Sequence, residues 1–250
     1  ISAGRLHRFA DGRASTLVEF AEPLSAVAPA GDGNLLLAVG HRLVLVDHAG
    51  AVVRDHAELN GPSEPWRFND GKTDPAGRFW VGVMATEAEP GKGALFRADP
   101  SGHFEKMLDG LTIPNGMAWS VDGSRFYFTD SPTREIWEFR FHADTGRLSD
   151  RRVAIRIPDS MGIPDGMAID ARGRLWVAHW GDGAVRCWDP EDGRPLAAVT
   201  VEDKLTTSCC FGGPRYNQLF ITAASGEDSA GRLFSATLSI YGRCAFTFNQ

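Results

Sequence analysis

The sequence predicts an all-β fold, a six-bladed β-propeller in which part of the N-terminal blade is missing from this chain of 250 residues. Three observations support this prediction. Helical periodicity is hard to find, because 28 glycines and 14 prolines interrupt the chain. A turn followed by a short apolar run recurs along most of the sequence. Other runs alternate apolar and polar side chains, as half-buried strands do. We expect residues 1–250 to form a single propeller domain.

The turn and its apolar run occur five times. Counted from the first apolar residue of each copy (35, 79, 126, 175 and 219), the steps are 44, 47, 49 and 44 residues. A period of about 40 to 50 residues with strand-length runs is typical of propellers, which have four strands in each blade. We expect the large apolar residues of these copies to pack between blades, namely Trp80, Phe126, Trp176 and Phe220.

A second strand-like run follows each copy, at residues 40–47, 93–99, 135–140, 183–189 and 231–234. Residues 4–9 have the same character, and their own turn and apolar run would fall before residue 1. We therefore expect five blades whose inner strands are visible and a sixth whose beginning is absent.

The composition restricts the partners. The formal net charge is −6 and there is no basic run, which argues against nucleic acid and against an anionic membrane surface. No apolar stretch approaches the roughly 20 residues of a membrane span. The N-terminus is neither a signal nor a transit peptide, and we interpret the four cysteines as reduced core thiols. These features predict a cytoplasmic protein, monomeric or a small homo-oligomer, with a small-molecule partner.

Three repeats carry a polar residue upstream of the apolar run, with glycine directly after it or one position later. Asn69, Asn115 and Asp165 precede their runs by ten, eleven and ten positions. Equivalent positions of a propeller lie at equivalent heights around its channel, so we expect these side chains to meet at one end of that channel, where ligands usually bind.

Residues 113–118 and 163–168 are the most informative copies, both reading Ile-Pro-[Asn/Asp]-Gly-Met-Ala. Proline restricts the entry and glycine allows close backbone approach, which holds the intervening side chain inward. The amide oxygen of Asn115 and the carboxylate of Asp165 are hard ligands that suit Ca²⁺, Mg²⁺ or Mn²⁺. The alternative is that both residues only cap turns. A metal site also needs a third protein oxygen.

Two charged residues are further candidates. Arg67, between Trp66 and Phe68, has a guanidinium fork suited to an oxygen-rich ligand, or it forms an ion pair with Glu64. Glu87 follows an inner strand on a loop that overhangs the channel mouth, or it is a solvated loop residue.

Other chemistry lacks its motifs. The seven histidines show no metal-ligand spacing, and we expect His179 to pack beside Trp180 or to lie at the rim. The Gly-x-Ser-x-Gly elbow of serine hydrolases is absent, as are phosphate-binding glycine loops and dinucleotide fingerprints.

Residues 66–84 and the segments Ile-Pro-Asn-Gly-Met-Ala-Trp-Ser, Ile-Pro-Asp-Gly-Met-Ala-Ile-Asp and Phe-Tyr-Phe-Thr-Asp-Ser resemble the SMP-30/gluconolactonase/luciferin-regenerating-enzyme (regucalcin-like) family. The resemblance runs over essentially all of the chain. It implies a six-bladed propeller that hydrolyses sugar lactones in carbohydrate metabolism and binds one divalent cation. Ca²⁺ is the first choice for this cation, and Zn²⁺, Mn²⁺, Mg²⁺ or iron are the others.

The resemblance also implies roles for individual residues. Asn115 and Asp165 match the family's metal ligands, and Asp165 also matches its proposed proton-transfer residue. Arg67, Asn69 and Glu87 match its substrate-contacting residues. One departure concerns the third ligand, a glutamate in a Gly-Glu-[Gly/Ser]-Pro-x-Trp segment near the N-terminus of the family, because no segment of this sequence matches it.

The expected function is therefore a metal-dependent sugar-lactone hydrolase of the gluconolactonase type, which opens an aldonolactone to the aldonic acid. Two alternatives stay open. One is a non-enzymatic propeller that binds a metal or a partner, and the other is a phosphotriesterase-like hydrolase acting on the same metal site.

Overall fold

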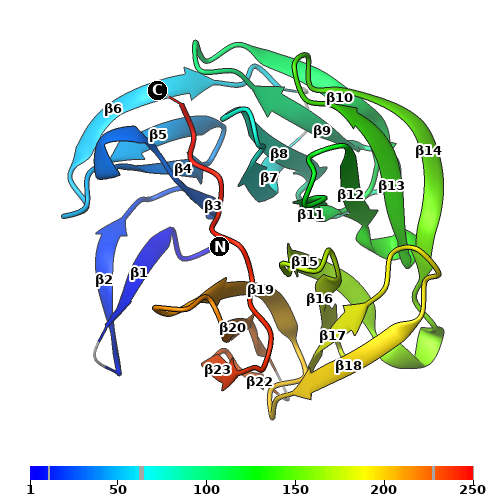
Figure 1. Cartoon of the computed structure of the whole chain (residues 1–250). Coiled ribbons are helices and arrows are strands. Elements are labelled where there is room, and N and C mark those ends of the chain that lie inside the picture. Colours follow the sequence, from blue (N-terminus) through cyan, green and yellow to red (C-terminus); the bar gives the residue numbers. More distant parts are fainter. Residues whose placement is uncertain (11, 62–64, 227–228, 250) are drawn as a thin grey trace. The chain divides into compact units, whose positions relative to one another are not determined.

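The computed structural model describes residues 1–10, 12–61, 65–226 and 229–249 (Figure 1). It contains two compact units, Ile1–Pro114 with Ala245–Gln250, and Asn115–Cys244. The described residues form strands and three short 3-10 turns, η1 (Gly31–Gly33), η2 (Ser131–Thr133) and η3 (Asp159–Met161). None of these helical turns has the length and apolar character needed to cross a bilayer.

The first unit contains two four-stranded antiparallel sheets and a hairpin. Consecutive strands are hydrogen-bonded neighbours in both sheets, β3-β4-β5-β6 and β7-β8-β9-β10. The strands are β1 (Arg5–Ala10), β2 (Arg13–Glu19), β3 (Leu24–Pro29), β4 (Leu35–Val39), β5 (Arg42–Val46), β6 (Val52–Glu58), β7 (Trp66–Thr73), β8 (Phe79–Ala85), β9 (Gly93–Ala98) and β10 (Phe104–Leu111). β8 is buried along its whole length, which explains its continuous apolar run.

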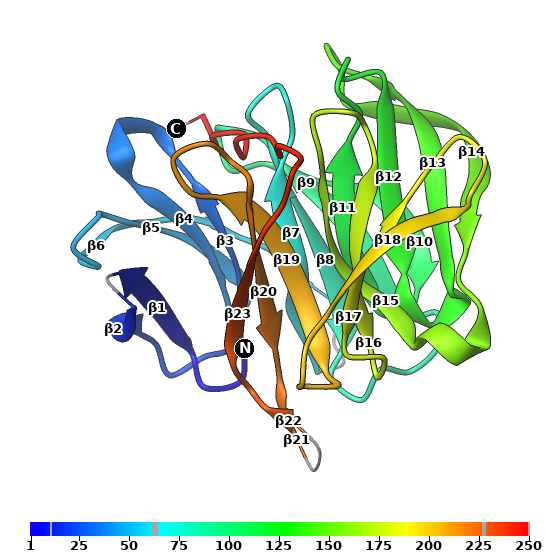
Figure 2. The same ribbon diagram turned by 60° about the horizontal axis from the view of Figure 1, so that its bottom comes forward.

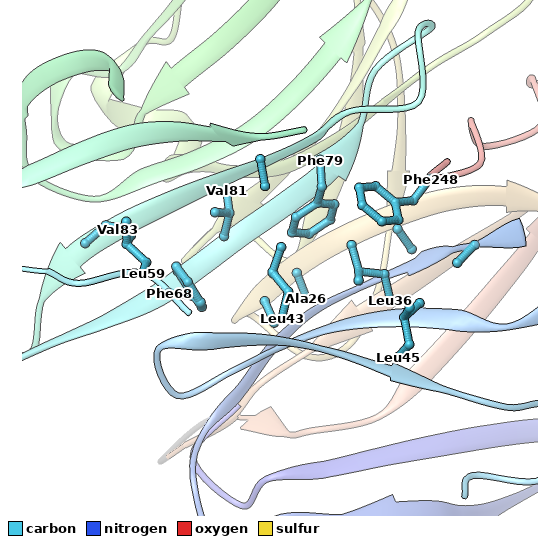
Figure 3. Close-up of a cluster of buried hydrophobic side chains, with 14 of the residues drawn as sticks. Ala26, Leu36, Leu43, Leu45, Leu59, Phe68, Phe79, Val81, Val83 and Phe248 are labelled. Carbon is cyan, nitrogen blue, oxygen red and sulfur yellow. The ribbon is translucent and has the colours of Figure 1, made fainter. Parts of the chain in front are cut away.

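Aromatic and aliphatic side chains fill the space between these two sheets (Figure 3). Phe68 and Phe79 of the second sheet face Leu36 and Leu43 of the first, and all four are fully buried. Phe248, from the C-terminal segment, completes the cluster. Burying a side chain of this size contributes about 1.5–3 kcal/mol, so this cluster fixes β7 firmly against β3.

The second unit contains two four-stranded sheets, β11-β12-β13-β14 and β15-β16-β17-β18, and the three-stranded sheet β19-β20-β23 (Figure 2). A short hairpin, β21-β22, lies beside the last sheet. The strands are β11 (Pro114–Trp119), β12 (Arg125–Asp130), β13 (Glu135–His142), β14 (Arg147–Arg156), β15 (Ile163–Ile169), β16 (Leu175–Trp180), β17 (Ala184–Trp188), β18 (Pro195–Thr200), β19 (Thr206–Gly212), β20 (Gln218–Ala223), β21 (Ser225–Gly226), β22 (Ser229–Ala230) and β23 (Leu233–Thr237).

The repeated turn has a physical basis in a buried aspartate. The carboxylate of Asp74 is fully buried and accepts hydrogen bonds from the backbone N–H groups of Ala76 and Arg78. It also accepts hydrogen bonds from the Arg78 Nε and from the indole N–H of Trp80, at 2.7 and 2.9 Å. A buried charge is tolerated when its hydrogen bonds are satisfied, and these contacts hold the turn onto its strand.

The same arrangement recurs in the second unit around Asp170. Its partners are the N–H groups of Arg172 and Arg174, the Arg174 guanidinium and the Trp176 indole. Trp80, Phe126 and Trp176 are buried, each with at most 4% of its surface exposed, and Phe220 is half-buried. Packing between blade sheets is observed for Trp176, which contacts Phe211 of β19.

The prediction of an all-β propeller is confirmed, but the predicted number of six blades is wrong. The described residues form five blade sheets of three or four strands. The stretch that we count as a sixth blade forms β1, and within the described part of the chain β1 pairs with β2 in a two-stranded sheet. Leu6 of β1, Val18 of β2 and Phe20 directly after β2 pack against the buried core of the β3–β6 sheet. The hairpin thus extends the packing of the first blade sheet.

The cysteine prediction holds in part. All four cysteines are free thiols, as expected. Cys187 and Cys209 are buried in the core, where desolvation raises the pKa of Cys187 to about 12. Cys210 and Cys244 are exposed, so the prediction that they are core residues is wrong.

Candidate functional site

In the first unit, the candidate residues Arg67 and Asn69 belong to β7, the first strand of its sheet, which has a β-bulge at this point. The pairing of β7 with β8 shifts between Phe68 and Gly71, so that Asn69 and Asp70 both lie opposite one residue of β8. A bulge inserts an extra residue and re-aims the side chains beside it, and bulges are frequent next to active sites. The polar pair therefore interrupts an otherwise regular, buried strand.

Hydrogen bonds fix the orientation of Asn69. Its side chain is 7% exposed, and its Nδ2 donates to the carbonyl oxygen of Pro114 at 3.0 Å. Its Oδ1 accepts a hydrogen bond of 2.8 Å from Arg67, whose guanidinium also donates to the Phe68 carbonyl at 2.9 Å. The structure thus brings Arg67 and Asn69 together. The alternative partner of Arg67, Glu64, lies outside the described residues.

Glu87 lies in the turn after β8 and is exposed. Arg67 pairs with Met84 across the ladder, so Glu87 is at the same end of the β7–β8 pair as Arg67. Its exposure suits either of the two roles predicted for it, and its role in binding stays a prediction.

Asp70 is a candidate that the sequence analysis missed. Its Oδ1 accepts the backbone N–H of Gly71 at 2.7 Å. Desolvation raises the pKa of this carboxyl above its usual range, and the nearby Lys72 opposes that shift. A carboxyl whose pKa is raised, directly after Asn69 in the bulge, is a typical feature of functional sites. The signal available in the sequence was its position next to Asn69 in the Asn-Asp-Gly segment.

In the second unit, the Asn115 side chain belongs to a buried hydrogen-bonded chain. Its Nδ2 donates to the Ser131 hydroxyl at 3.0 Å, and that hydroxyl donates to the Pro164 carbonyl oxygen at 2.7 Å. Asn115 and Ser131 are 7% and 4% exposed. The chain links β11 to the residue that directly precedes Asp165.

The backbones of the two repeated segments also meet. A Cβ atom placed on Gly116 would lie 2.3 Å from the carbonyl oxygen of Asp165, so only glycine fits at this close approach. Asp165 itself is half-buried and lies at a second bulge, where the β15–β16 pairing shifts between Pro164 and Met167. The structure therefore brings the Asn115 and Asp165 segments side by side within one unit.

His179 supports the Asp165 segment through the turn that precedes it. It is fully buried, its Nδ1 donates to the Met161 carbonyl oxygen at 2.6 Å, and its Nε2 accepts the Trp188 indole N–H at 3.2 Å. Desolvation lowers the pKa of His179 to about 4, so the ring is neutral at pH 7. Of the two predicted roles, packing is the one observed, since the ring is buried and stacks on Trp188.

The donor set in this unit suits an oxygen-preferring cation. Ser131 takes the Nδ2 end of Asn115, which leaves the Oδ1 end for another partner, and the half-buried Asp165 adds a carboxylate from the adjoining segment. Such oxygens match Ca²⁺, Mg²⁺ and Mn²⁺. Among the residues that the structure describes, no three His, Cys, Asp or Glu side chains cluster in a manner suited to a metal. The observed donors are therefore one amide and one carboxylate.

Comparison with known proteins identifies the family of this chain. The sequence profile of the "SMP-30/Gluconolactonase/LRE-like region" matches residues 1–225. The chain belongs to this family. Regucalcin from Bos taurus is 38% identical over 217 residues, which cover 84% of this chain and 73% of the relative.

Solved structures of family members have the same fold. The crystal structure of a regucalcin from Agrobacterium tumefaciens, described as a calcium-binding protein, superposes with a TM-score of 0.90 at 31% identity over 98% of this chain and 86% of that one. A gluconolactonase from Xanthomonas campestris gives a TM-score of 0.71 at 25% identity, covering 89% of this chain and 76% of its own. Family membership thus supports a gluconolactonase-like function.

Proposed function

We propose that this protein is a metal-dependent lactonase, which hydrolyses a five- or six-membered aldonolactone to the hydroxy acid. The observation that carries the proposal is the pairing of the two Ile-Pro-[Asn/Asp]-Gly segments, with Gly116 packed on the Asp165 backbone. Family membership and the likeness to a gluconolactonase support the same function.

Asn115 and Asp165 would hold the cation through their side-chain oxygens. When bound, the cation supplies Lewis-acid polarisation of the lactone carbonyl, which is worth several kcal/mol in the transition state. A calcium-binding regucalcin among the family's solved structures favours Ca²⁺.

The remaining chemistry falls to side chains of this protein. The Asp165 carboxylate accepts a proton from the attacking water and returns it to the ring oxygen that leaves, contributions typical of general acid–base catalysis. Arg67 and Asn69, already hydrogen-bonded to each other, orient the sugar hydroxyls, and Glu87 contacts the exposed end of the sugar.

The test is hydrolysis of a panel of aldonolactones by the protein with and without a chelator. We expect turnover that chelation abolishes and that added Ca²⁺ or Mn²⁺ restores. Absence of chelator-sensitive turnover, together with measurable cation binding, favours a non-enzymatic metal-binding propeller. A higher specificity constant for phosphotriesters than for every lactone favours the phosphotriesterase-like alternative.

A further inference from the structure

The side-chain amide of Asn115 has an NH₂ group, which donates hydrogen bonds, and an oxygen, which accepts them. A cation binds only the oxygen. A rotation of the amide by a half-turn would present the NH₂ group instead. Some partner must therefore select the orientation if Asn115 is to serve as a ligand.

The hydrogen-bonded chain through Ser131 makes that selection. The Pro164 carbonyl oxygen can only accept, so the single hydroxyl hydrogen of Ser131 goes to it across 2.7 Å. The Ser131 oxygen is then left as an acceptor, and the Asn115 group 3.0 Å away must be its NH₂. The direction of the chain thus turns the Asn115 Oδ1 away from Ser131.

We propose that Ser131 is a positioning residue, which orients the Asn115 amide oxygen toward the cation and ties it to the Asp165 segment. This inference rests on the proposed function, because it requires that Asn115 binds a cation. Ser131 touches neither the substrate nor the cation in this assignment. It acts through Asn115 and through the backbone of Pro164, one residue before Asp165.

The position of Ser131 in the fold suits this role. It begins the turn η2, directly after β12, and is 4% exposed. Buried hydrogen bonds of a neutral pair are rigid and costly to leave unmade, so the hydroxyl keeps its direction when the site is empty and when it is filled. Partners of this kind typically change metal affinity by about 10- to 100-fold when they are removed.

The experiment is a calorimetric titration of the protein with Ca²⁺, and in parallel with Mn²⁺, in the absence of substrate. We expect Ser131→Ala to raise the cation Kd by about 10-fold or more. Ser131→Thr, which keeps the hydroxyl, should stay within about 3-fold of the parent Kd, since the buried chain is retained.

The matched control is Thr129→Val. Thr129 is also buried, lies two residues away, and donates its hydroxyl to a backbone carbonyl, that of Glu135, at 2.8 Å. Its loss removes a comparable hydrogen bond without touching Asn115. We expect a lower melting temperature for Thr129→Val but an unchanged cation Kd.

The outcomes separate the two proposals. If the parent protein binds the cation and Ser131→Ala binds it equally well, or no worse than Thr129→Val, the positioning role is overturned while the lactonase proposal stands. If the parent protein binds neither cation and hydrolyses no lactone, the proposed function itself fails. Should Ser131→Ala not fold, a Ser131→Thr Kd raised as far as that of Asn115→Ala would overturn the positioning role.

Discussion

The two Ile-Pro-[Asn/Asp]-Gly-Met-Ala segments have nearly the same sequence but are supported in different ways. Asn115 is 7% exposed and its amide is oriented by the Ser131 hydroxyl. Asp165 is half-buried, and its segment is supported through the backbone, where the Pro164 carbonyl accepts a hydrogen bond from the Ser131 hydroxyl.

The chemistry of the two side chains explains the difference. The two ends of an amide differ, so Asn115 requires a partner that selects its oxygen end. Both oxygens of a carboxylate accept, so Asp165 needs only a well-placed backbone. The same backbone motif can thus deliver a neutral and an anionic ligand, provided that the surroundings differ.

The largest effect is expected from the carboxylate itself. Asp165→Asn should lower kcat/KM for the best lactone by about 1,000-fold, because the residue that transfers the proton is lost. The measurement is initial-rate kinetics at saturating Ca²⁺. Asp159→Asn is the control, since its carboxylate is exposed on the turn η3 and forms an ion pair with Arg134 at 3.4 Å; equal losses in both variants would contradict the catalytic role of Asp165.

Exchanging the two polar residues tests whether their positions differ in function. The double variant Asn115→Asp/Asp165→Asn keeps the charge and the donor atoms, yet we expect kcat/KM to fall by at least about 100-fold, because the carboxylate is moved away from the proton-transfer position. Cation affinity, measured by calorimetry, should fall as well, because a carboxylate at position 115 cannot donate the hydrogen bond that the Ser131 oxygen accepts. Retention of full activity would mean that the two segments are interchangeable.

The two glycines after the polar residues provide a stability comparison. A methyl group on Gly116 would meet the Asp165 carbonyl oxygen at 2.3 Å, whereas on Gly166 its nearest atom is the Ser208 hydroxyl oxygen at 2.3 Å. At Gly166 the nearest backbone atom is the Thr207 carbonyl oxygen, at the longer distance of 2.9 Å. The shorter backbone clash costs more, so Gly116→Ala should lower the free energy of unfolding by about 3 kcal/mol and Gly166→Ala by about 2 kcal/mol. Urea unfolding of both variants gives these values, and the reverse order would contradict the packing described here.

The last expected effect is a pH dependence of stability from His179. Desolvation lowers its pKa to about 4 in the folded protein, against about 6.5 when unfolded, so between these values only the unfolded state takes up the proton. Stability is therefore lost as pH falls from about 6.5 toward 4. The expected loss between pH 7 and 5 is about 2 kcal/mol.

His179→Gln should have a flatter profile of unfolding free energy against pH than the parent, measured by urea unfolding at pH 7, 6 and 5. The exposed His142 in the same unit provides the control, and His142→Gln should keep the steep profile of the parent. Identical slopes for His179→Gln and the parent would show that this histidine does not carry the acid sensitivity.

Much of the fold was predictable from local pattern. The five turn–strand copies predicted the strands β4, β8, β12, β16 and β20, because glycine turns and apolar runs encode strands locally. The number of blades was not predictable in this way. Residues 4–9 have the same sequence pattern as the other strands, but a strand belongs to a blade only if it pairs with the strands of that blade. In the described structure, β1 pairs with β2 in a separate hairpin.

The candidate site, too, was predictable from the sequence only in part. Spacing alone singled out Asn69, Asn115 and Asp165, because a repeat places equivalent residues on equivalent strands. Ser131 and Asp70 escaped detection, since a hydroxyl partner and a desolvated carboxyl depend on what packs around them. The local sequence determined which residues are turns, strands and polar interruptions. Only the tertiary structure decided which way an amide faces and which carboxyl loses its water, because hydrogen-bond partners and desolvation come from segments distant in the chain.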